Sequence, residues 1–352
     1  MEEFAQSGAE VVVLAPFDEV VDDISKLGIR CIDVKMSRQG LNPLVEILTV
    51  YRLIRTLRKE RPDIVFNFSI KPVIYGGIAA YAIKSCHIFS MITGLGHLFV
   101  QQTRKYRALQ AILIPLYRIA IKRNKGVFFH NPDDKQLFIQ HKIIPSDKGY
   151  VINGSGINLE HYRPEPDKIE PKTFLLISRL LWSKGIKEYV EAARVLKSKY
   201  PDIEFQLLGP LDDNPASVKK SEIEEWKREG VIRYLGSTND VRPYLHRASV
   251  FVLPTWYREG RPRAILEAMS CGKPIITTDT PGCRQTVDHG ENGLLVRTRD
   301  VEALAAAMEE FLVNDELVIK MGRRSRQLAE EKYSVSKVID SILSVMTQAL
   351  AS

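Results

Sequence analysis

The 352-residue chain has few cysteines and no long hydrophobic run. Its four cysteines stand singly, with no Cys-x-x-Cys pair and no histidine cluster nearby, which excludes a disulfide-stabilised fold and argues against cysteine-bound metal. The longest apolar stretch, residues 111–117, contains a proline and falls short of the roughly 20 residues that a membrane-spanning helix requires. The acidic start lacks the features of a secretion signal. These absences predict a cytoplasmic enzyme with reduced, buried thiols.

The sequence also lacks an Asp-x-Asp motif. Its adjacent aspartates at residues 22–23, 133–134 and 212–213 lie in loop or helix-start contexts, where solvation or helix capping accounts for them. The Gly-x-Gly segments at residues 94–96 and 154–156 do not complete the Gly-x-Gly-x-x-Gly pattern of a dinucleotide site between a strand and a helix. We therefore expect no metal, no cofactor and no hydride transfer.

Acidic residues are scarce in the first half of the chain. Residues 37–142 carry 17 Lys and Arg against 5 Asp and Glu, a net charge of +12, whereas residues 161–352 carry 29 against 28. Such a basic surface is either simply solvated or attracts anionic lipid headgroups or a phosphorylated substrate. Nucleic acid is a third alternative, but no nucleic-acid-binding motif is present. Basic ends flank an apolar middle in residues 104–125, as in a helix that covers a sheet or docks on an anionic membrane leaflet.

Short β-branched and aromatic runs alternate with helical stretches, which predicts parallel sheets covered by helices on both faces. Strands are expected at residues 10–15, 29–34, 63–68, 87–92 and 126–130, and again at 173–178, 204–208, 231–235, 249–253 and 274–277. A linker rich in proline and charge, residues 163–171, separates the two sets. We expect two doubly wound Rossmann-like domains, residues 1–165 and 166–335, and a helix at residues 336–352 that packs back toward the first. Because the chain opens in what looks like the end of a helix, a first strand and its loop are expected to be missing.

The strongest motif lies at residues 254–274, directly after an expected strand. Pro262 suits a first helical turn, which places Glu267 inside the helix and Glu259 in the turn before it. The free N–H groups of a helix start can bind a phosphate or sugar hydroxyls. Glu259 could then accept hydrogen bonds from sugar hydroxyls and Glu267 from a ribose diol; the alternative is a capping carboxylate and an exposed one.

Two cations, Arg179 and Lys184, directly follow the expected strand at residues 173–178. The carboxyl ends of parallel strands form one edge of a sheet, so both cations face the same crevice as Glu259. There they can neutralise a nucleotide diphosphate as it leaves. The alternative is a pair of solvated surface cations.

The frame Glu-Gly-x-Pro-x-x-x-Leu-Glu-Ala-Met that begins at Glu259 resembles the signature of retaining glycosyltransferases of family 4, which have the two-domain GT-B fold. The resemblance extends over most of the second domain, to residues 178–185, 207–209, 234–236, 278–284 and 292–296. It implies that Arg179 and Lys184 hold the donor diphosphate, that Glu259 contacts the transferred sugar and that Glu267 contacts the ribose. The further donor-binding candidates are Gly260, Arg261, Pro262 and Leu266 near the helix start and Leu235, Gly236 and Val241 at the nucleobase.

In the first domain, residues 69–76 and 93–97 fall at strand ends. With residues 36–43 and 131–134 they resemble the subgroup of N-acetylgalactosaminyltransferases and capsule or O-antigen glycosyltransferases that elongate polyprenyl-diphosphate-linked sugars. The acceptor-side candidates are Lys71, Thr93, Gly94 and His97. Many family members have a histidine here that reaches the donor sugar. Thr93 or Gly94 takes its place in this chain and His97 follows a few residues later, so no catalytic histidine is assigned.

The resemblance implies metal-independent transfer, with retention, of a sugar such as an N-acetylhexosamine from a UDP-sugar to a polyprenyl-diphosphate-linked glycan. The leaving diphosphate would help to remove the acceptor's proton. Such an enzyme would associate peripherally with the inner face of the cytoplasmic membrane through its basic first domain. Two alternatives stay open: a degenerate GT-B chain that binds a sugar nucleotide or a partner without transfer, and a GT-B epimerase that releases UDP without an acceptor.

Overall fold

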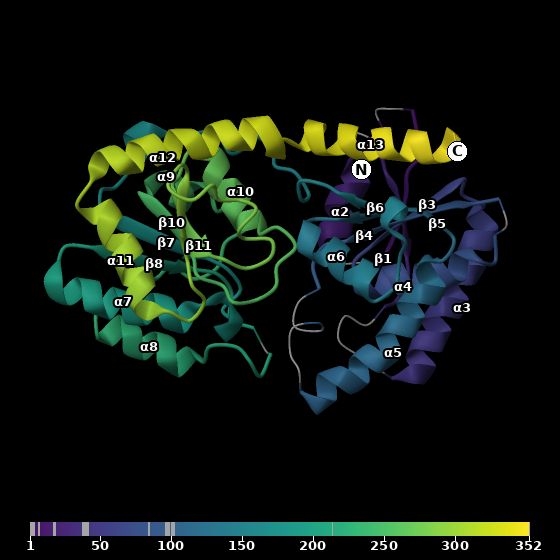
Figure 1. Ribbon diagram of the computed structural model, residues 1–352, viewed down its shortest axis with the longest axis horizontal. Helices are drawn as coiled ribbons and strands as arrows, with labels where there is room; N and C mark the ends of the chain where they lie inside the picture. The colour runs from purple at the N-terminus through teal and green to yellow at the C-terminus, as the bar shows by residue number, and fades with distance from the viewer. Residues whose placement is uncertain are drawn as a thin grey trace.

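The computed structural model describes residues 4–5, 8–16, 19–36, 42–83, 85–95, 99, 103–212 and 214–351. Figure 1 shows two lobes side by side, each built from strands flanked by helices, with the last helix lying against the N-terminal lobe. Every strand pair in these residues is parallel. The expected fold class, two Rossmann-like domains with parallel sheets, is confirmed.

The N-terminal lobe contains a four-stranded and a two-stranded sheet. The larger sheet has the order β3 (Ile64–Phe68), β4 (His87–Ile92), β5 (Asn124–Phe129) and β6 (Gly149–Val151), and β1 (Val12–Ala15) pairs with β2 (Arg30–Asp33). The helices of this lobe are α2 (Glu19–Lys26), α3 (Pro43–Glu60), α4 (Ile70–Ala80), α5 (Arg104–Ile121) and α6 (Pro132–Gln140), with a 3-10 turn at Ser146–Lys148. Helices α3 and α5 both pack on α4, so the three form one layer.

The C-terminal lobe contains one six-stranded sheet. Its order is β12 (Gly293–Val296), β11 (Ile275–Thr278), β10 (Val250–Leu253), β7 (Thr173–Ile177), β8 (Glu204–Leu208) and β9 (Arg233–Tyr234). Its helices are α7 (Ile186–Lys199), α8 (Lys220–Arg228), α9 (Arg242–Arg247), α10 (Arg263–Ser270), α11 (Val301–Leu312) and α12 (Asp315–Leu328), with 3-10 turns at Pro166–Lys168 and Trp182–Lys184. The chain adds β8 and β9 on one side of β7 and β11 and β12 on the other side of β10. The strand order therefore reverses between β7 and β10, where a doubly wound sheet opens its ligand crevice.

Local sequence explains where the key helices begin. Helix α3 starts after Asn42, whose side-chain oxygen accepts a hydrogen bond from the Leu44 amide at 3.1 Å, and it has a proline in its first turn. Helix α6 starts in the same way after Asn131, which accepts from the Asp134 amide at 2.8 Å. Both N-cap residues follow the pattern Asn-Pro, in which the proline occupies a position whose N–H would have no helical partner.

Two strands have no counterpart among the expected ones. Strand β6 has three residues and β12 has four, and both begin with glycine. Their positions depend on pairing with the neighbouring strands β5 and β11 rather than on a long β-branched run.

The chain crosses back to the N-terminal lobe near its end. A π-helical turn at Ala329–Tyr333 leads into α13 (Val335–Ala351), the yellow helix along one edge of the N-terminal lobe in Figure 1. Val338, Ile342, Met346 and Ala349 lie on one face of α13 and are buried. They pack against side chains of the N-terminal sheet, including Phe89, Met91 and Phe128. Helix α13 is thus held by the lobe opposite to the one that precedes it.

Candidate active site

The carboxyl ends of β7 and β10 bring the two charged motifs together. Arg179 and Lys184 follow β7, and Glu259 follows β10. Lys184 Nζ forms an ion pair with Glu259 Oε1, and the side chains are only 16% and 13% exposed. This contact joins the two segments that flank the point where the strand order reverses. A cation and a carboxylate therefore lie in contact at the expected mouth of the crevice.

Neighbouring side chains hold this ion pair in place. The Thr255 hydroxyl lies 3.4 Å from Glu259 Oε1 and also donates to the Ser183 carbonyl at 3.0 Å. The ammonium of Lys184 lies 5.3 Å from the centre of the Tyr257 ring, within the range of a cation–π contact. Gly185 directly follows Lys184. Its φ is +77°, and a Cβ at this position would lie 2.1 Å from the Pro254 carbonyl oxygen. Only glycine lets the two loops approach this closely.

Arg179 lies on the rim of the same site. Its guanidinium donates to Asp212 at 3.2 Å and is 63% exposed. Burial raises the pKa of Tyr257, the Glu259 carboxylate raises it further, and Arg179 acts against both. Lys184 and Glu259 are thus the buried ion pair of the site, and Arg179 is an exposed cation at the end of the same strand, β7.

Glu267 lies in α10, one turn beyond the helix start, and is 8% exposed. Its Oε1 accepts hydrogen bonds from the Tyr162 hydroxyl at 3.0 Å and from Arg263 Nε at 2.9 Å. The carboxylate raises the pKa of Tyr162, which burial already raises, to about 12. Arg263 precedes Glu267 by one helical turn, so the sequence contained a signal for this contact. Tyr162 is 105 residues away and gave none.

The remaining donor-side candidates occupy different environments. Leu235 and Gly236 follow β9 and lie partly exposed beside Gly209, whose amide donates to the Gly236 carbonyl at 2.8 Å. Val241 is the residue before α9 and is also partly exposed. Leu266, in contrast, is fully buried in the core of the C-terminal lobe.

Arg261 turns away from the ion pair. It donates to Asn153 Oδ1 at 2.9 Å, and its guanidinium lies 5.2 Å from the centre of the Tyr333 ring. Burial lowers its pKa. The guanidinium therefore already has partners, and Gly260 and Pro262 on either side of it offer backbone rather than side-chain groups.

Two acceptor-side candidates touch the loop between β10 and α10, residues 254–262, which we call the donor loop. A Cβ on Gly260 would lie 1.7 Å from the Thr93 carbonyl oxygen, and a Cβ on Gly94 would lie 2.6 Å from the Gly260 amide nitrogen. Residues 93–94 follow β4 of the N-terminal lobe, so the strand ends of the two lobes meet here. Lys71 lies at the start of α4 and forms an ion pair with Glu46 at 2.6 Å. His97 lies outside the described residues.

His130 is a second histidine near the donor loop, and the sequence reasoning missed it. It directly follows β5 and is 5% exposed, and its Nε2 has no hydrogen-bond partner among the described residues. Burial, reinforced by the nearby Arg261 guanidinium, lowers the pKa of His130 to about 4. The ring is therefore neutral at neutral pH. A buried histidine beside Gly260 could not be inferred from sequence, because the contact joins two domains.

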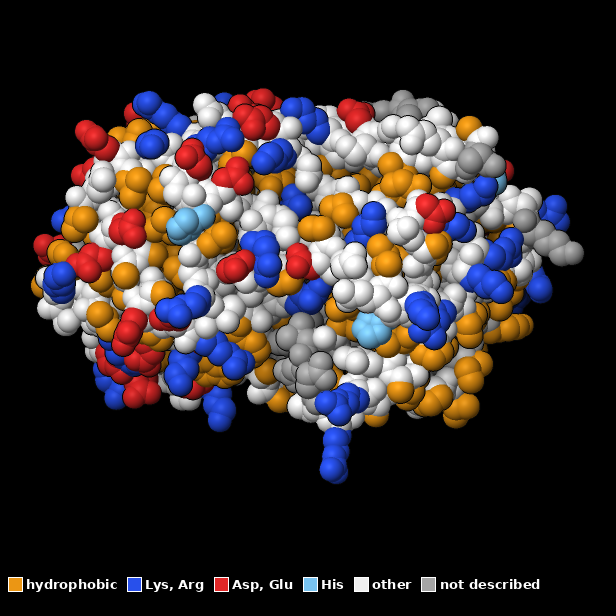
Figure 2. Space-filling view, viewed as in Figure 1, with side chains coloured by type: hydrophobic (Ala, Val, Ile, Leu, Met, Phe, Trp, Pro, Cys, Tyr) orange, Lys and Arg blue, Asp and Glu red, His pale blue; other side chains and the backbone are white. Residues whose placement is uncertain are grey.

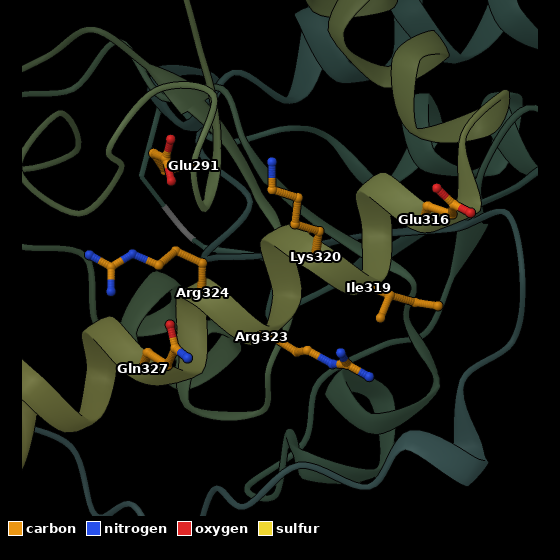
Figure 3. Close-up of a pocket in the computed structure, with 7 residues that line it drawn as sticks. All are labelled: Glu291, Glu316, Ile319, Lys320, Arg323, Arg324 and Gln327. Atoms are coloured by element: carbon orange, nitrogen blue, oxygen red, sulfur yellow. The ribbon is translucent and has the colours of Figure 1, made fainter.

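A hollow of about 440 Å³ lies elsewhere, on the outer side of α12. It is lined by Glu291, Glu316, Ile319, Lys320, Arg323, Arg324 and Gln327. Figure 3 shows Glu291 on a separate loop and the others pointing in different directions from α12. We therefore place the site at the strand ends. Among the described residues, no group of three or more His, Cys, Asp or Glu side chains is placed to hold a metal ion.

Two parallel α/β domains that meet at their strand ends, with cations and carboxylates where the strand order reverses, define a two-domain enzyme of the GT-B type. The sequence comparisons identify the family. Residues 160–328 match the family described as "Glycosyl transferases group 1", and residues 1–131 match "Glycosyl transferase 4-like". The chain belongs to this family of glycosyltransferases.

Relatives of known name support the assignment. The chain is 30% identical to the N,N'-diacetylbacillosaminyl-diphospho-undecaprenol alpha-1,3-N-acetylgalactosaminyltransferase of Campylobacter jejuni, over 90% of this chain and 86% of that protein. It is 25% identical to the UDP-Gal:alpha-D-GlcNAc-diphosphoundecaprenol alpha-1,3-galactosyltransferase of Escherichia coli, over 93% and 85% of the two chains.

Solved structures share the fold. The sucrose-phosphate synthase of Thermosynechococcus elongatus superposes with a TM-score of 0.81 at 18% identity, over 99% of this chain and 91% of that chain. HepE of Anabaena, solved with UDP and glucose, superposes with a TM-score of 0.78 at 18% identity, over 96% and 91% of the two chains.

Proposed function

We propose that this glycosyltransferase moves a sugar, in the first place an N-acetylhexosamine, from a UDP-sugar to a polyprenyl-diphosphate-linked glycan, with retention at the anomeric carbon and without a metal ion. The observation that carries the proposal is the Lys184–Glu259 ion pair where the strand order reverses, with Arg179 following the same strand end. The two relatives named above act on diphospho-undecaprenol-linked sugars, and the name of the second includes UDP-galactose as the donor. Those names supply the substrate classes.

In the proposed reaction, the bond between the sugar C1 and the diphosphate oxygen breaks as the acceptor oxygen bonds to C1 on the same face. The acceptor's proton passes to a diphosphate oxygen, so the products are the extended glycan and UDP. Negative charge grows on the diphosphate as the bond breaks. Lys184, Arg179 and the N–H groups at the start of α10 stabilise that charge. The two side-chain cations take the place that a metal ion would otherwise have.

Glu259 binds the hydroxyls of the transferred sugar in this proposal. Its carboxylate accepts hydrogen bonds only, which suits a ring that presents several O–H donors. When the diphosphate arrives, Lys184 can contact it while it stays beside Glu259, because an ammonium group has three donors. Glu267, in the same lobe, binds the ribose diol through its carboxylate.

The proposed experiment incubates the protein with a panel of nucleotide sugars and a short-chain polyprenyl-diphosphate sugar, with and without EDTA, and follows the product by mass spectrometry. We expect the acceptor to gain the mass of one sugar, UDP to appear only with acceptor present, and EDTA to leave the rate unchanged. UDP release at an equal rate without acceptor would favour an epimerase. Binding of the nucleotide without turnover would favour a non-catalytic protein.

We also propose that the N-terminal lobe docks on an anionic membrane surface, where a lipid-linked acceptor resides. Helix α3 supports this, because five large apolar side chains in its first half are exposed: Leu44 (77%), Ile47 (66%), Tyr51 (60%), Leu48 (45%) and Val45 (43%). Exposed apolar groups of this size, clustered on one helix, are uncommon on soluble surfaces. No helix in the described part of the chain has both the length and the apolarity needed to cross a bilayer.

The surrounding charges fit the same partner. Arg52, Arg55, Arg58 and Lys59 are exposed further along α3. On the neighbouring helix α5, Ile112 and Ile119 are exposed together with Arg104, Arg107 and Arg118. On the face shown in Figure 2, acidic side chains gather over the lobe on the left, whereas the N-terminal lobe on the right presents mainly basic and hydrophobic groups. Each cation near an anionic leaflet contributes about 1 kcal/mol.

A further inference from the structure

One asparagine of the N-terminal lobe forms hydrogen bonds with the backbone of the donor loop. Asn131 follows β5 and is fully buried. Its side-chain nitrogen donates to the carbonyl oxygen of Glu259 at 3.2 Å and to that of Gly260 at 3.1 Å. These two carbonyls belong to the two successive peptide bonds that follow Glu259, whose carboxylate we assign to the transferred sugar. Asn131 therefore holds, from the opposite lobe, the backbone that carries the Glu259 side chain.

The orientation of this amide is fixed by its partners. The side-chain oxygen of Asn131 accepts from the Asp134 amide at 2.8 Å, as the N-cap of α6. The nitrogen faces three oxygen acceptors, the two donor-loop carbonyls and Asp134 Oδ2 at 3.1 Å. A flipped amide would turn its oxygen toward all three acceptors and its N–H groups toward a donor. The arrangement therefore requires an NH2 group directed at the donor loop.

The donor loop has no room to shift within this contact. A Cβ on Gly282 would lie 2.5 Å from the carbonyl oxygens of both Glu259 and Gly260. On the other side, a Cβ on Gly260 would lie 1.7 Å from the Thr93 carbonyl oxygen. Backbone of the C-terminal lobe and backbone of the N-terminal lobe thus enclose the same peptide.

A buried ion pair strengthens the same junction. Arg258 Nε donates to Asp134 Oδ1 at 2.6 Å, and Asp134 has no exposed side-chain surface. Gln285 Nε2 adds a hydrogen bond to Asp133 Oδ2 at 2.9 Å. The first turn of α6 therefore binds the donor loop and the loop after β11, and Figure 1 places α6 on the side of its lobe that faces the C-terminal lobe. All of these partners come from segments more than 100 residues apart in sequence.

We propose that Asn131 is a positioning residue for the transferred sugar: by holding the Glu259 and Gly260 carbonyls, it lets the acceptor-side lobe complete the sugar half of the donor site. The Arg258–Asp134 ion pair fastens the two lobes at that point. This inference rests on the proposed function. The inference predicts different effects on the UDP half and the sugar half of the donor. Arg179 and Glu267, which we assign to the UDP half, lie in the C-terminal lobe and form no hydrogen bond or ion pair with Asn131 in the described structure. UDP binding is then independent of Asn131, and correct placement of the sugar requires it.

Two substitutions test the role without removing the helix cap. In Asn131→Ser, the hydroxyl still caps α6 but is too short to reach both carbonyls. In Asn131→Asp, the shape and the cap remain, but an oxygen replaces the NH2 group. The matched control is Asn314→Ser at the N-cap of α12, where Asn314 accepts from the Leu317 amide at 3.0 Å. Thermal melting of all three variants checks that they fold.

The first measurement separates kcat from nucleotide binding. We expect kcat to fall roughly 10- to 100-fold in Asn131→Ser and further in Asn131→Asp, because a displaced reacting group costs up to about 10²-fold. The Kd for UDP, measured by calorimetry, should stay within about twofold of the parent, and Asn314→Ser should match the parent in both. Unchanged kcat in folded Asn131→Ser and Asn131→Asp would overturn the inference, as would an equal loss of UDP affinity.

The second measurement needs no turnover. Hydrogen–deuterium exchange of the peptide spanning residues 255–262 should quicken in both Asn131 variants and stay unchanged in Asn314→Ser. If the parent transfers no sugar but this loop loosens, the transferase proposal fails and the structural role of Asn131 stands. If the parent transfers sugar while the loop exchanges as before in the Asn131 variants, the inference fails and the transferase stands.

Discussion

The substitution Lys184→Ala tests the proposed role of the ion pair in stabilising the leaving diphosphate. The substitution removes the ammonium from a site where both partners are at least five-sixths buried, so solvent screens the interaction weakly. It leaves Glu259 with the Thr255 hydroxyl at 3.4 Å. Removing one preorganised donor to a developing charge costs about 2.7–4 kcal/mol of transition-state stabilisation, or roughly 10²- to 10³-fold in kcat. We expect a loss in that range.

The assay measures acceptor-dependent UDP release under saturating donor. Lys187→Ala is the matched control, because Lys187 is an exposed cation at the start of the following helix, α7. Lys184→Arg retains the charge with a longer reach and should recover part of the lost rate. Turnover of Lys184→Ala within about threefold of the parent, with a folded protein, would refute the assignment of this cation to the diphosphate.

Three further predictions follow from other parts of the molecule. Glu267→Gln should weaken UDP binding about tenfold in calorimetry, because an uncharged amide replaces the carboxylate that we propose as the acceptor for the ribose diol; unchanged affinity would contradict the proposed role. The double substitution Leu44→Glu with Ile47→Glu should reduce flotation with phosphatidylglycerol vesicles about tenfold or more, whereas Ile319→Glu on the exposed face of α12 should not. Burial lowers the pKa of His130 to about 4, so the unfolded state binds the proton first and this residue should cost about 2 kcal/mol of stability as the pH drops from 6.5 to 5; chemical denaturation at both values should show a loss larger by that amount in the parent than in His130→Gln, and equal losses would contradict it.

Much of the fold could be predicted because parallel strands in a doubly wound sheet are buried on both faces. Strand β7, for example, is buried at every position and reads as a continuous apolar run. Strands β6 and β12 were not predicted. They have three and four residues and begin with glycine, so they are too short to show a hydrophobic pattern typical of a strand. Their pairing partners define them.

The site residues also differ in whether a local sequence pattern indicates them. Lys184 and Glu259 could be identified as candidates because each follows a strand end within a recognisable local frame. Asn131 and Arg258 lie in segments that carried motifs, but their roles and that of His130 could not be predicted, because these depend on contacts between the lobes. The Asn131 contact with the Glu259 carbonyl spans 128 residues, and no local spacing encodes it. His97, the histidine that the sequence suggested, lies outside the described residues.

The central claim concerns where an activated sugar binds, and a crystal structure of the protein with a UDP-sugar tests it most directly. The account predicts diphosphate oxygens within hydrogen-bond distance of Lys184 and Arg179, the ribose at Glu267 and the sugar hydroxyls at Glu259. A diphosphate bound in the hollow beside α12, or anywhere away from the ends of β7 and β10, would contradict it.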